Sequence, residues 1–267
     1  MVAIWGFVLW IANGCIFHII CVHFFAIGLS LMHKVLGAKE RPGIFYYIIS
    51  FVFLTEIGVR TQLSYRYMAS FFGLAFMICM LGCWCIVNIK KDWMAVAFSA
   101  VCFALGMGFY QVDIGCAALV LLMNLLCILY NNQYYRLFWK QMLKDSIAGG
   151  LGIGLYMIIY KVLLHVNQVP MSVRVGSNGL KATVMISTIP NNILRCYRGL
   201  IEYFVLDEWN KNVFQNGKLL YGLVALLFLV GTVSVMIGMI KTKGKCKPFL
   251  WVVLILLSPV FLIAAIL

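Results

Sequence analysis

Three groups of polar residues in this sequence could do chemistry, and each lies beside a long apolar stretch. In the first group, Glu56 and Arg60 are four residues apart, so they share a face if a helix continues through them. They form either a neutralised ion pair at a membrane boundary or a site where the carboxylate removes a proton and the guanidinium binds a phosphate. Because a carboxylate so close to a membrane is costly, Glu56 is a candidate functional residue.

The second group is the segment 110–113, which separates two apolar stretches and has glycines on both sides. Glycine lets two helices approach closely, so this segment predicts a tight helical hairpin. Its polar members are Tyr110, Gln111 and Asp113. Asp113 either caps the N-terminus of the second helix, or points with Gln111 into an external cavity and binds sugar hydroxyls.

The third group lies in a long polar segment, 166–217, which we expect to be an external loop. Apolar side chains recur at helical spacing between residues 191 and 209, which predicts an amphipathic helix. The helix is too polar to span a membrane, so it should lie in the outer interface with its apolar face down. Arg195 and Arg198 fall on another face, where they either pack at the membrane surface or face an anionic lipid headgroup.

The cysteine and histidine residues give no sign of a metal site. Cys83 and Cys85 are separated by one residue, a spacing that fits neither a zinc site nor a redox motif. Most of the ten cysteines lie within apolar stretches, where cysteine behaves as a small hydrophobic residue. We therefore predict neither a metal nor a cofactor.

The composition shows what kind of molecule must position these groups. A soluble domain is about 45–50% apolar and about 25% charged, whereas this chain of 267 residues is 64% hydrophobic and 11% charged. A soluble protein of this size cannot bury so much apolar surface. The chain is therefore an integral membrane protein, and soluble enzymes, secreted disulfide scaffolds and disordered chains are excluded.

The apolar runs predict an all-α, polytopic helical bundle with about eight transmembrane helices and one external interfacial helix. Each run is continuous and close to the length of about 20 residues that a spanning helix needs. Residues 1–267 are predicted to form a single transmembrane domain. The predicted spans are 3–32, 44–59, 67–89, 93–109, 114–130, 147–165, 219–240 and 248–267.

The net charge of +13 predicts orientation rather than nucleic-acid binding, because Lys and Arg collect in cytoplasmic loops. Basic residues crowd the short segments 34–41, 90–91, 136–144 and 241–247, whereas the short loops on the other side carry only Arg60 and Arg66. The crowded side is predicted to be cytoplasmic. The N-terminus, the C-terminus and all three polar groups are then outside.

Several short motifs follow one another in a distinctive order. They are Tyr65-Arg66-Tyr67 at the start of a span, Gly106 to Gln111 at the end of the next, a basic loop at 134–144, Tyr156 to Lys161 at the end of a Gly-rich span, and Ile189 to Asn192 in the long loop. Over roughly residues 46–228 this order resembles the bacterial multi-span O-antigen glucosyltransferases. That serotype-converting family uses a polyprenyl-phosphate-linked glucose donor.

The resemblance implies a GT-C architecture that works on the outer face of the bacterial cytoplasmic membrane. The partners it implies are the polyprenyl-phosphate-linked sugar, a cell-surface polysaccharide acceptor and the lipid bilayer. A carboxylate takes the proton of the acceptor hydroxyl, and basic groups stabilise the departing phosphate. The implied roles are catalysis for Glu56 and Asp113, phosphate binding for Arg60, Arg66, Arg195 and Arg198, and sugar or acceptor binding for Tyr110, Gln111, Asn191 and Asn192.

One departure from this family leaves other functions open. Such transferases start inside, cross once and place a key acid in the first external loop, which this chain lacks. We therefore expect an N-terminally shortened member that is either inactive or uses Glu56 or Asp113 instead. The alternatives are a non-catalytic accessory or remnant protein of glycan assembly, a lipid-linked-glycan transporter, and a polymerase. Lys161 is the one charge expected inside a strong span, which disfavours proton-coupled transport.

Overall fold

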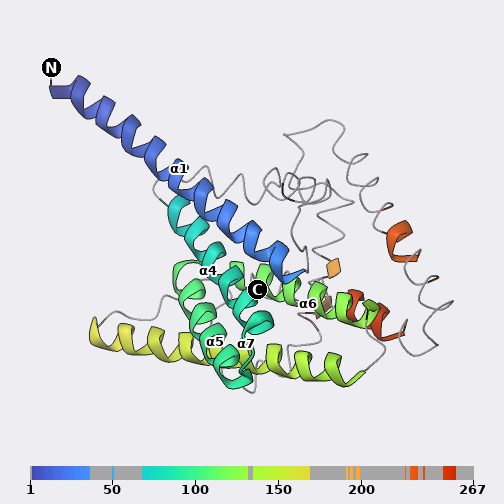
Figure 1. Ribbon diagram of the computed structural model, residues 1–267. Coiled ribbons are helices and arrows are strands. Elements are labelled where there is room, and N and C mark those ends of the chain that lie inside the picture. The colour runs from blue at the N-terminus through green and yellow to red at the C-terminus, as the bar shows by residue number, and fades with distance from the viewer. Residues whose placement is uncertain are drawn as a thin grey trace. The chain divides into compact units, whose positions relative to one another are not determined.

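The computed structural model describes the backbone of residues 2–36, 50, 68–131, 135–168, 191, 193–194, 197–198, 226, 229–233, 237 and 249–256, and the side chains of these residues except 2–18 and 131. Every described element is an α-helix (Figure 1). The long helices are α1 (Val2–Val35), α4 (Ala69–Asn88), α5 (Asp92–Phe109), α6 (Asp113–Asn131) and α7 (Tyr135–Val166).

Four of these helices, α4 to α7, are long and apolar enough to cross a membrane, and α1 contains a shorter apolar stretch, Ile19–Val35. The bounds of α4, α5 and α6 lie within two residues of the predicted spans 67–89, 93–109 and 114–130. The predicted spans 44–59, 219–240 and 248–267 lie wholly or mostly outside the described residues.

The start of α7 corrects two predictions. The basic segment 134–144 was expected to be a loop, but the helix already begins at Tyr135. Its charges do not break the helix, because Lys140 and Lys144 lie one turn apart and both pair with Asp92. Asp145 then lies within this apolar helix and is buried, so Lys161 is not the one charge inside a strong span.

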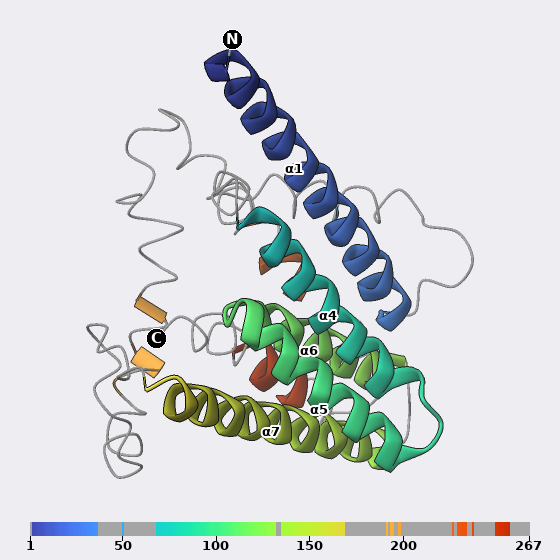
Figure 2. The same cartoon turned by 90° about the vertical axis from the view of Figure 1, so that its left-hand side faces the viewer.

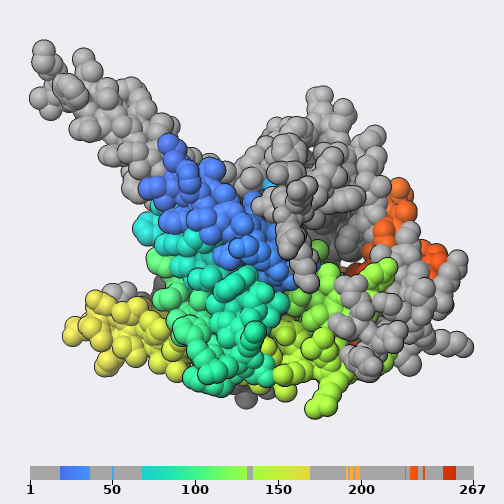
Figure 3. All heavy atoms as spheres, viewed as in Figure 1, coloured from blue at the N-terminus to red at the C-terminus, as the bar shows by residue number. Residues whose placement is uncertain are grey.

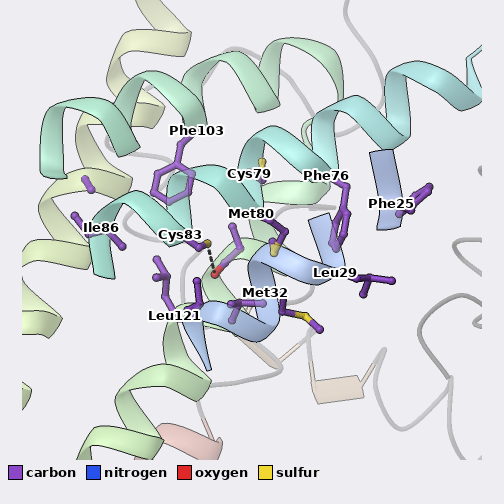
Figure 4. Close-up of a cluster of buried hydrophobic side chains, with 14 of the residues drawn as sticks. Phe25, Leu29, Met32, Phe76, Cys79, Met80, Cys83, Ile86, Phe103 and Leu121 are labelled. Carbon is purple, nitrogen blue, oxygen red and sulfur yellow. Dashed lines mark hydrogen bonds between the residues drawn. The ribbon is translucent and has the colours of Figure 1, made fainter. Parts of the chain in front are cut away.

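The chain divides into two compact units, and the first contains Met1–Leu125 and Arg136–Pro170. Its core is centred on α4, whose buried hydrophobic side chains pack with those of α1, α5 and α6. Phe25, Cys79, Cys83, Phe103 and Leu121 all belong to this cluster (Figure 4). Figure 3 shows the described part of α1 lying along α4, and contacts between the two helices are extensive.

Close packing depends on glycines at the helix crossings. A Cβ atom at Gly73 would lie 2.8 Å from the backbone oxygen of Cys21, and one at Gly82 would lie 2.7 Å from the ring of Phe103. Contacts this short do not occur with real Cβ atoms, so these helix pairs need glycine in order to approach.

The second unit contains Leu126–Tyr135 and Met171–Leu267. Besides the last residues of α6, its described parts are short helical pieces, including residues 229–233 and 249–256. Trp251 and Leu254 are buried, and the Tyr197 hydroxyl donates a hydrogen bond to the Leu256 carbonyl. This bond ties Tyr197 to the helical piece 249–256.

Contacts within the first unit show how its helices run. α4 and α5 are antiparallel, because the start of α4 meets the end of α5 through Phe72 and Tyr110, whose ring centroids are 4.5 Å apart. Towards the other end, the Ser99 hydroxyl of α5 donates to the Gly82 carbonyl of α4 at 2.8 Å. The three residues Ile89 to Lys91 connect the two helices.

α7 runs in the same direction as α5. Lys140, in the first half of α7, pairs with Asp92 at the start of α5, and Tyr156, further along, bonds Gln111 just past its end. The first unit therefore has two distinct ends (Figure 2). We call them the hairpin end, with Tyr110, Gln111, Asp113, Tyr156 and Tyr160, and the basic end, with Lys90, Lys91, Arg136, Lys140 and Lys144.

Candidate functional site at the hairpin end

The site is built on the connection between α5 and α6, which is only three residues long. The Tyr110 N–H bonds the Gly106 carbonyl at 2.9 Å and ends α5, and the Gly115 N–H bonds the Val112 carbonyl at 3.0 Å as α6 begins. The Tyr110 ring packs on Phe72, so the hairpin is held against the start of α4. Local turn geometry and one aromatic contact thus fix where residues 110–113 lie.

Gln111 is exposed, and its amide Nε2 donates a hydrogen bond to the hydroxyl oxygen of Tyr156. Tyr156 in turn stacks on Tyr160, with ring centroids 5.9 Å apart and planes inclined by 19°. Both tyrosines belong to α7. The amide of Gln111 and the two phenol rings therefore form one polar cluster at the hairpin end. Amides and phenols offer the donors and acceptors that sugar hydroxyls need.

Asp113 is the first residue of α6, and it points inward rather than into solvent. Only 4% of the residue is exposed, and its Oδ2 has no hydrogen-bond partner in the structure. A buried polar oxygen without a partner is unfavourable by about 1–3 kcal/mol, and by more when it is charged, so such a group calls for an explanation.

The arrangement can perform acid–base chemistry. A carboxylate oxygen without a partner can accept the proton of a hydroxyl that reaches it. Asp113 follows Gln111 by two residues in the chain. Its Oδ2 is buried, whereas the Gln111 amide and its Tyr156 partner could hold a sugar hydroxyl at the surface of the hairpin end. Among the described side chains, no three from His, Cys, Asp and Glu gather as metal ligands would.

The structure thus brings together three of the predicted site residues, Tyr110, Gln111 and Asp113. Asn191 and Arg198 belong to the second unit, and both are exposed in short helical pieces. The other predicted site residues lie outside the described residues: Glu56, Arg60, Arg66, Asn192 and Arg195.

Sequence reasoning gave no role to Tyr156 or Tyr160, although a signal was present. Two tyrosines spaced i, i+4 near the end of an apolar helix share one face, and tyrosine collects at membrane interfaces. That pattern alone points to the interface. Only the packing of α7 against α5 shows that this face meets Gln111.

Among known protein families, the model described as Glucosyl transferase GtrII matches residues 7–267 of the chain. The match includes the hairpin and all of α7, and it confirms the resemblance seen in the order of the motifs. No curated protein and no solved structure matches the chain.

Proposed function

Because the chain belongs to the glucosyl transferase GtrII family, we propose that this multi-pass membrane protein transfers a glucosyl residue from a polyprenyl-phosphate-linked donor to a cell-surface glycan. The reaction takes place on the outer face of the bacterial cytoplasmic membrane. The observation that carries the assignment of the site is the buried carboxyl group of Asp113, which has an oxygen without a partner among the described residues and lies at the hairpin end, two residues after Gln111 in the chain.

The proposed reaction has one proton transfer and one exchange of bonds. A hydroxyl of the acceptor glycan gives its proton to a carboxylate, Asp113 or Glu56, and its oxygen bonds to the anomeric carbon of the donor glucose. The bond from that carbon to the phosphate oxygen breaks, and the electron pair leaves with the phosphate. Arginines stabilise the new phosphate charge, since guanidinium groups bind phosphate in a bidentate manner.

The other site residues hold the sugars or the phosphate. Gln111 and Tyr110 bind the sugar at the hairpin end, and Tyr156 orients the Gln111 amide through its hydroxyl. Outside this cluster, we propose phosphate binding by Arg60, Arg66, Arg195 and Arg198, and acceptor binding by Asn191 and Asn192.

The proposed topology places this chemistry on one face of the membrane. About eight spans form one transmembrane domain, with the N-terminus, the C-terminus, the hairpin end and the loop 166–217 outside. The basic end then faces the cytoplasm, in agreement with the collection of Lys and Arg in cytoplasmic loops. The interfacial helix at 191–209 lies on the outer membrane surface.

A transfer assay tests the proposal. Membranes that contain the chain are incubated with polyprenyl-phosphate-[14C]glucose and a candidate surface glycan, and label in the glycan is measured. Membranes without the chain and membranes with an active relative of the family serve as controls. The proposal expects label above the empty-membrane background. If the relative labels the glycan and this chain does not, the chain is a non-catalytic member.

Transport of a lipid-linked glycan is a second candidate, and Asp145 favours it. This acid lies inside α7, where Gln141 Nε2 donates to its Oδ1 at 2.8 Å while Oδ2 has no partner in the structure. Buried acids within a span often mark ion-coupled pathways. In vesicles, Asp145→Asn would abolish translocation of a lipid-linked sugar if transport were the function, and would leave glucosyl transfer intact if it were not.

A further inference from the structure

The basic end of the first unit carries a rim of cations that the proposed reaction does not use. Lys90 and Lys91 are exposed between α4 and α5, and Arg136 and Lys140 are exposed at the start of α7. Asp92 joins the two parts of the rim, with Oδ2 at 2.8 Å from Lys140 Nζ and Oδ1 at 3.2 Å from Lys144 Nζ. The start of α7 therefore lies beside the α4–α5 connection (Figure 2).

The charges of this rim do not balance. Among the described residues, the basic end has one exposed carboxylate, Asp92, and four exposed cations, Lys90, Lys91, Arg136 and Lys140, while the side chain of Lys144 is only 14% exposed. The nearby acid Asp145 is buried and faces Gln141, so it does not contribute to the outer surface. The rim consequently presents a net positive charge to whatever lies outside it.

The first half of α7 also has an exposed apolar stripe beside its basic stripe. Arg136, Lys140 and Lys144 recur every four residues, and so do Trp139, Leu143 and Ile147, of which Trp139 and Leu143 stand directly before Lys140 and Lys144. Trp139 is 50% exposed and Leu143 is 60% exposed. A third face, with Phe138, Gln141, Asp145, Ala148 and Gly152, is the one that is buried.

The position of the rim along the helices matches the edge of a bilayer. α5 has 18 residues, which gives a length of about 27 Å, close to the hydrocarbon thickness of about 30 Å. Asp92 and the basic end therefore stand at headgroup level. Trp93, which is 72% exposed, lies at the same level, and tryptophan collects at that depth.

We propose that the basic end binds the phosphate groups of anionic phospholipids, with the acyl chains against Trp139 and Leu143. The two adjacent stripes favour a lipid over a soluble anion. An interfacial helix binds by placing apolar side chains among the acyl chains and basic ones at anionic headgroups. A free phosphate would use the cations alone and leave the apolar stripe in water. This inference does not depend on the proposed glucosyl transfer.

The test measures lipid binding to the purified full chain in mild detergent by native mass spectrometry. Phosphatidylglycerol and phosphatidylcholine of equal chain length are the two probes. Each cation near an anionic surface changes binding by about fivefold. We expect wild type to prefer phosphatidylglycerol by more than about tenfold, and Arg136→Gln to lower its binding about fivefold. Lys161→Gln, which removes an exposed cation from the far half of the same helix, should leave binding unchanged.

Two further measurements identify the class of ligand. Leu143→Ser should also weaken phosphatidylglycerol binding if acyl chains lie on the apolar stripe, and millimolar inorganic phosphate should not displace the lipid. Equal affinity for the two lipids would overturn the proposal. So would equal losses in Arg136→Gln and Lys161→Gln. Full displacement by inorganic phosphate, with no effect of Leu143→Ser, would show a general anion site instead.

Discussion

The hairpin end is held together by two side chains, Gln111 from the α5–α6 connection and Tyr156 from α7. A polar contact of this kind fixes the orientation of an exposed amide, which would otherwise turn freely. Its net contribution to stability is modest, at about 0.5–1.5 kcal/mol. The larger consequence is for binding, because an oriented amide presents its acceptor and donor in fixed directions.

Tyr156→Phe removes the hydroxyl that accepts the Gln111 hydrogen bond and keeps the ring that stacks on Tyr160. We expect the Michaelis constant for the sugar substrate to rise by about 3- to 10-fold, since one hydrogen bond that orients Gln111 is lost. Tyr160→Phe is the matched control and keeps the hydrogen bond. Steady-state transfer kinetics distinguish them, and equal effects of the two variants would contradict an orienting role for Tyr156.

At the residue scale, the sequence indicated the segment 110–113 but not how Asp113 is packed. Hydropathy places this acid at the end of an apolar run, where it is expected to meet water. Its burial follows from the packing of α6 against α4, where the Cys83 thiol donates to the Ala117 carbonyl at 3.6 Å across 34 residues of sequence. Contacts over such separations have no local signature, and the same reason hides Tyr156.

At the element scale, the sequence predicts the ends of a helix well when an uncharged apolar run is flanked by polar residues or a turn. α4, α5 and α6 end close to the predicted limits because Lys90 and Lys91 or the Tyr110 turn interrupts them. α7 begins twelve residues before the predicted span 147–165, because the basic residues at 136–144, which are typical of a loop, lie within the helix. Arginine and lysine are good helix formers, and the three α7 cations share a stripe that leaves the buried face apolar.

The glycines at the helix crossings give a prediction on stability. Gly73→Ala places a methyl group 2.8 Å from the backbone oxygen of Cys21, which cannot move aside without shifting α1. We expect a loss of about 1–3 kcal/mol. Gly150→Ala is the matched control, since nothing lies within 4 Å of its added Cβ, and it should be neutral or raise stability by up to about 1 kcal/mol.

Thermal loss of the monodisperse peak in size-exclusion chromatography measures both variants in one detergent. The close approach of α1 to α4 predicts a lower melting temperature for Gly73→Ala alone. Equal shifts in the two variants would mean that α1 and α4 do not pack as closely as the structure shows.

At the scale of the whole molecule, composition and motif order carried the main conclusions. The apolar content established a membrane protein, and the motif order gave the family that residues 7–267 match. The direction in which the bundle crosses the membrane is a prediction from charge alone. This orientation can be tested, because the hairpin end and the basic end must face opposite sides of the membrane.

Labelling tests this orientation. In a variant in which all ten native cysteines are replaced, Gln111→Cys should react with a membrane-impermeant maleimide added to intact cells, and Lys91→Cys should react only after lysis. The charge bias predicts this pattern. The reverse pattern would place the hairpin end in the cytoplasm and remove it from the face where the proposed transfer occurs.

The most direct test of the hairpin end as the reaction site compares two buried acids of the same unit. Asp113 lies at the hairpin end and Asp145 lies inside α7, directly after Lys144 of the basic end, and each has an oxygen without a partner among the described residues. Glucosyl transfer is measured for Asp113→Asn and Asp145→Asn at matched levels of folded protein. We expect Asp113→Asn to lower the rate by at least about 100-fold, as loss of a general base does, and Asp145→Asn to leave it within about twofold, since Asp145 has no part in the proton transfer. Undiminished transfer by Asp113→Asn would contradict the assignment of the reaction to this end.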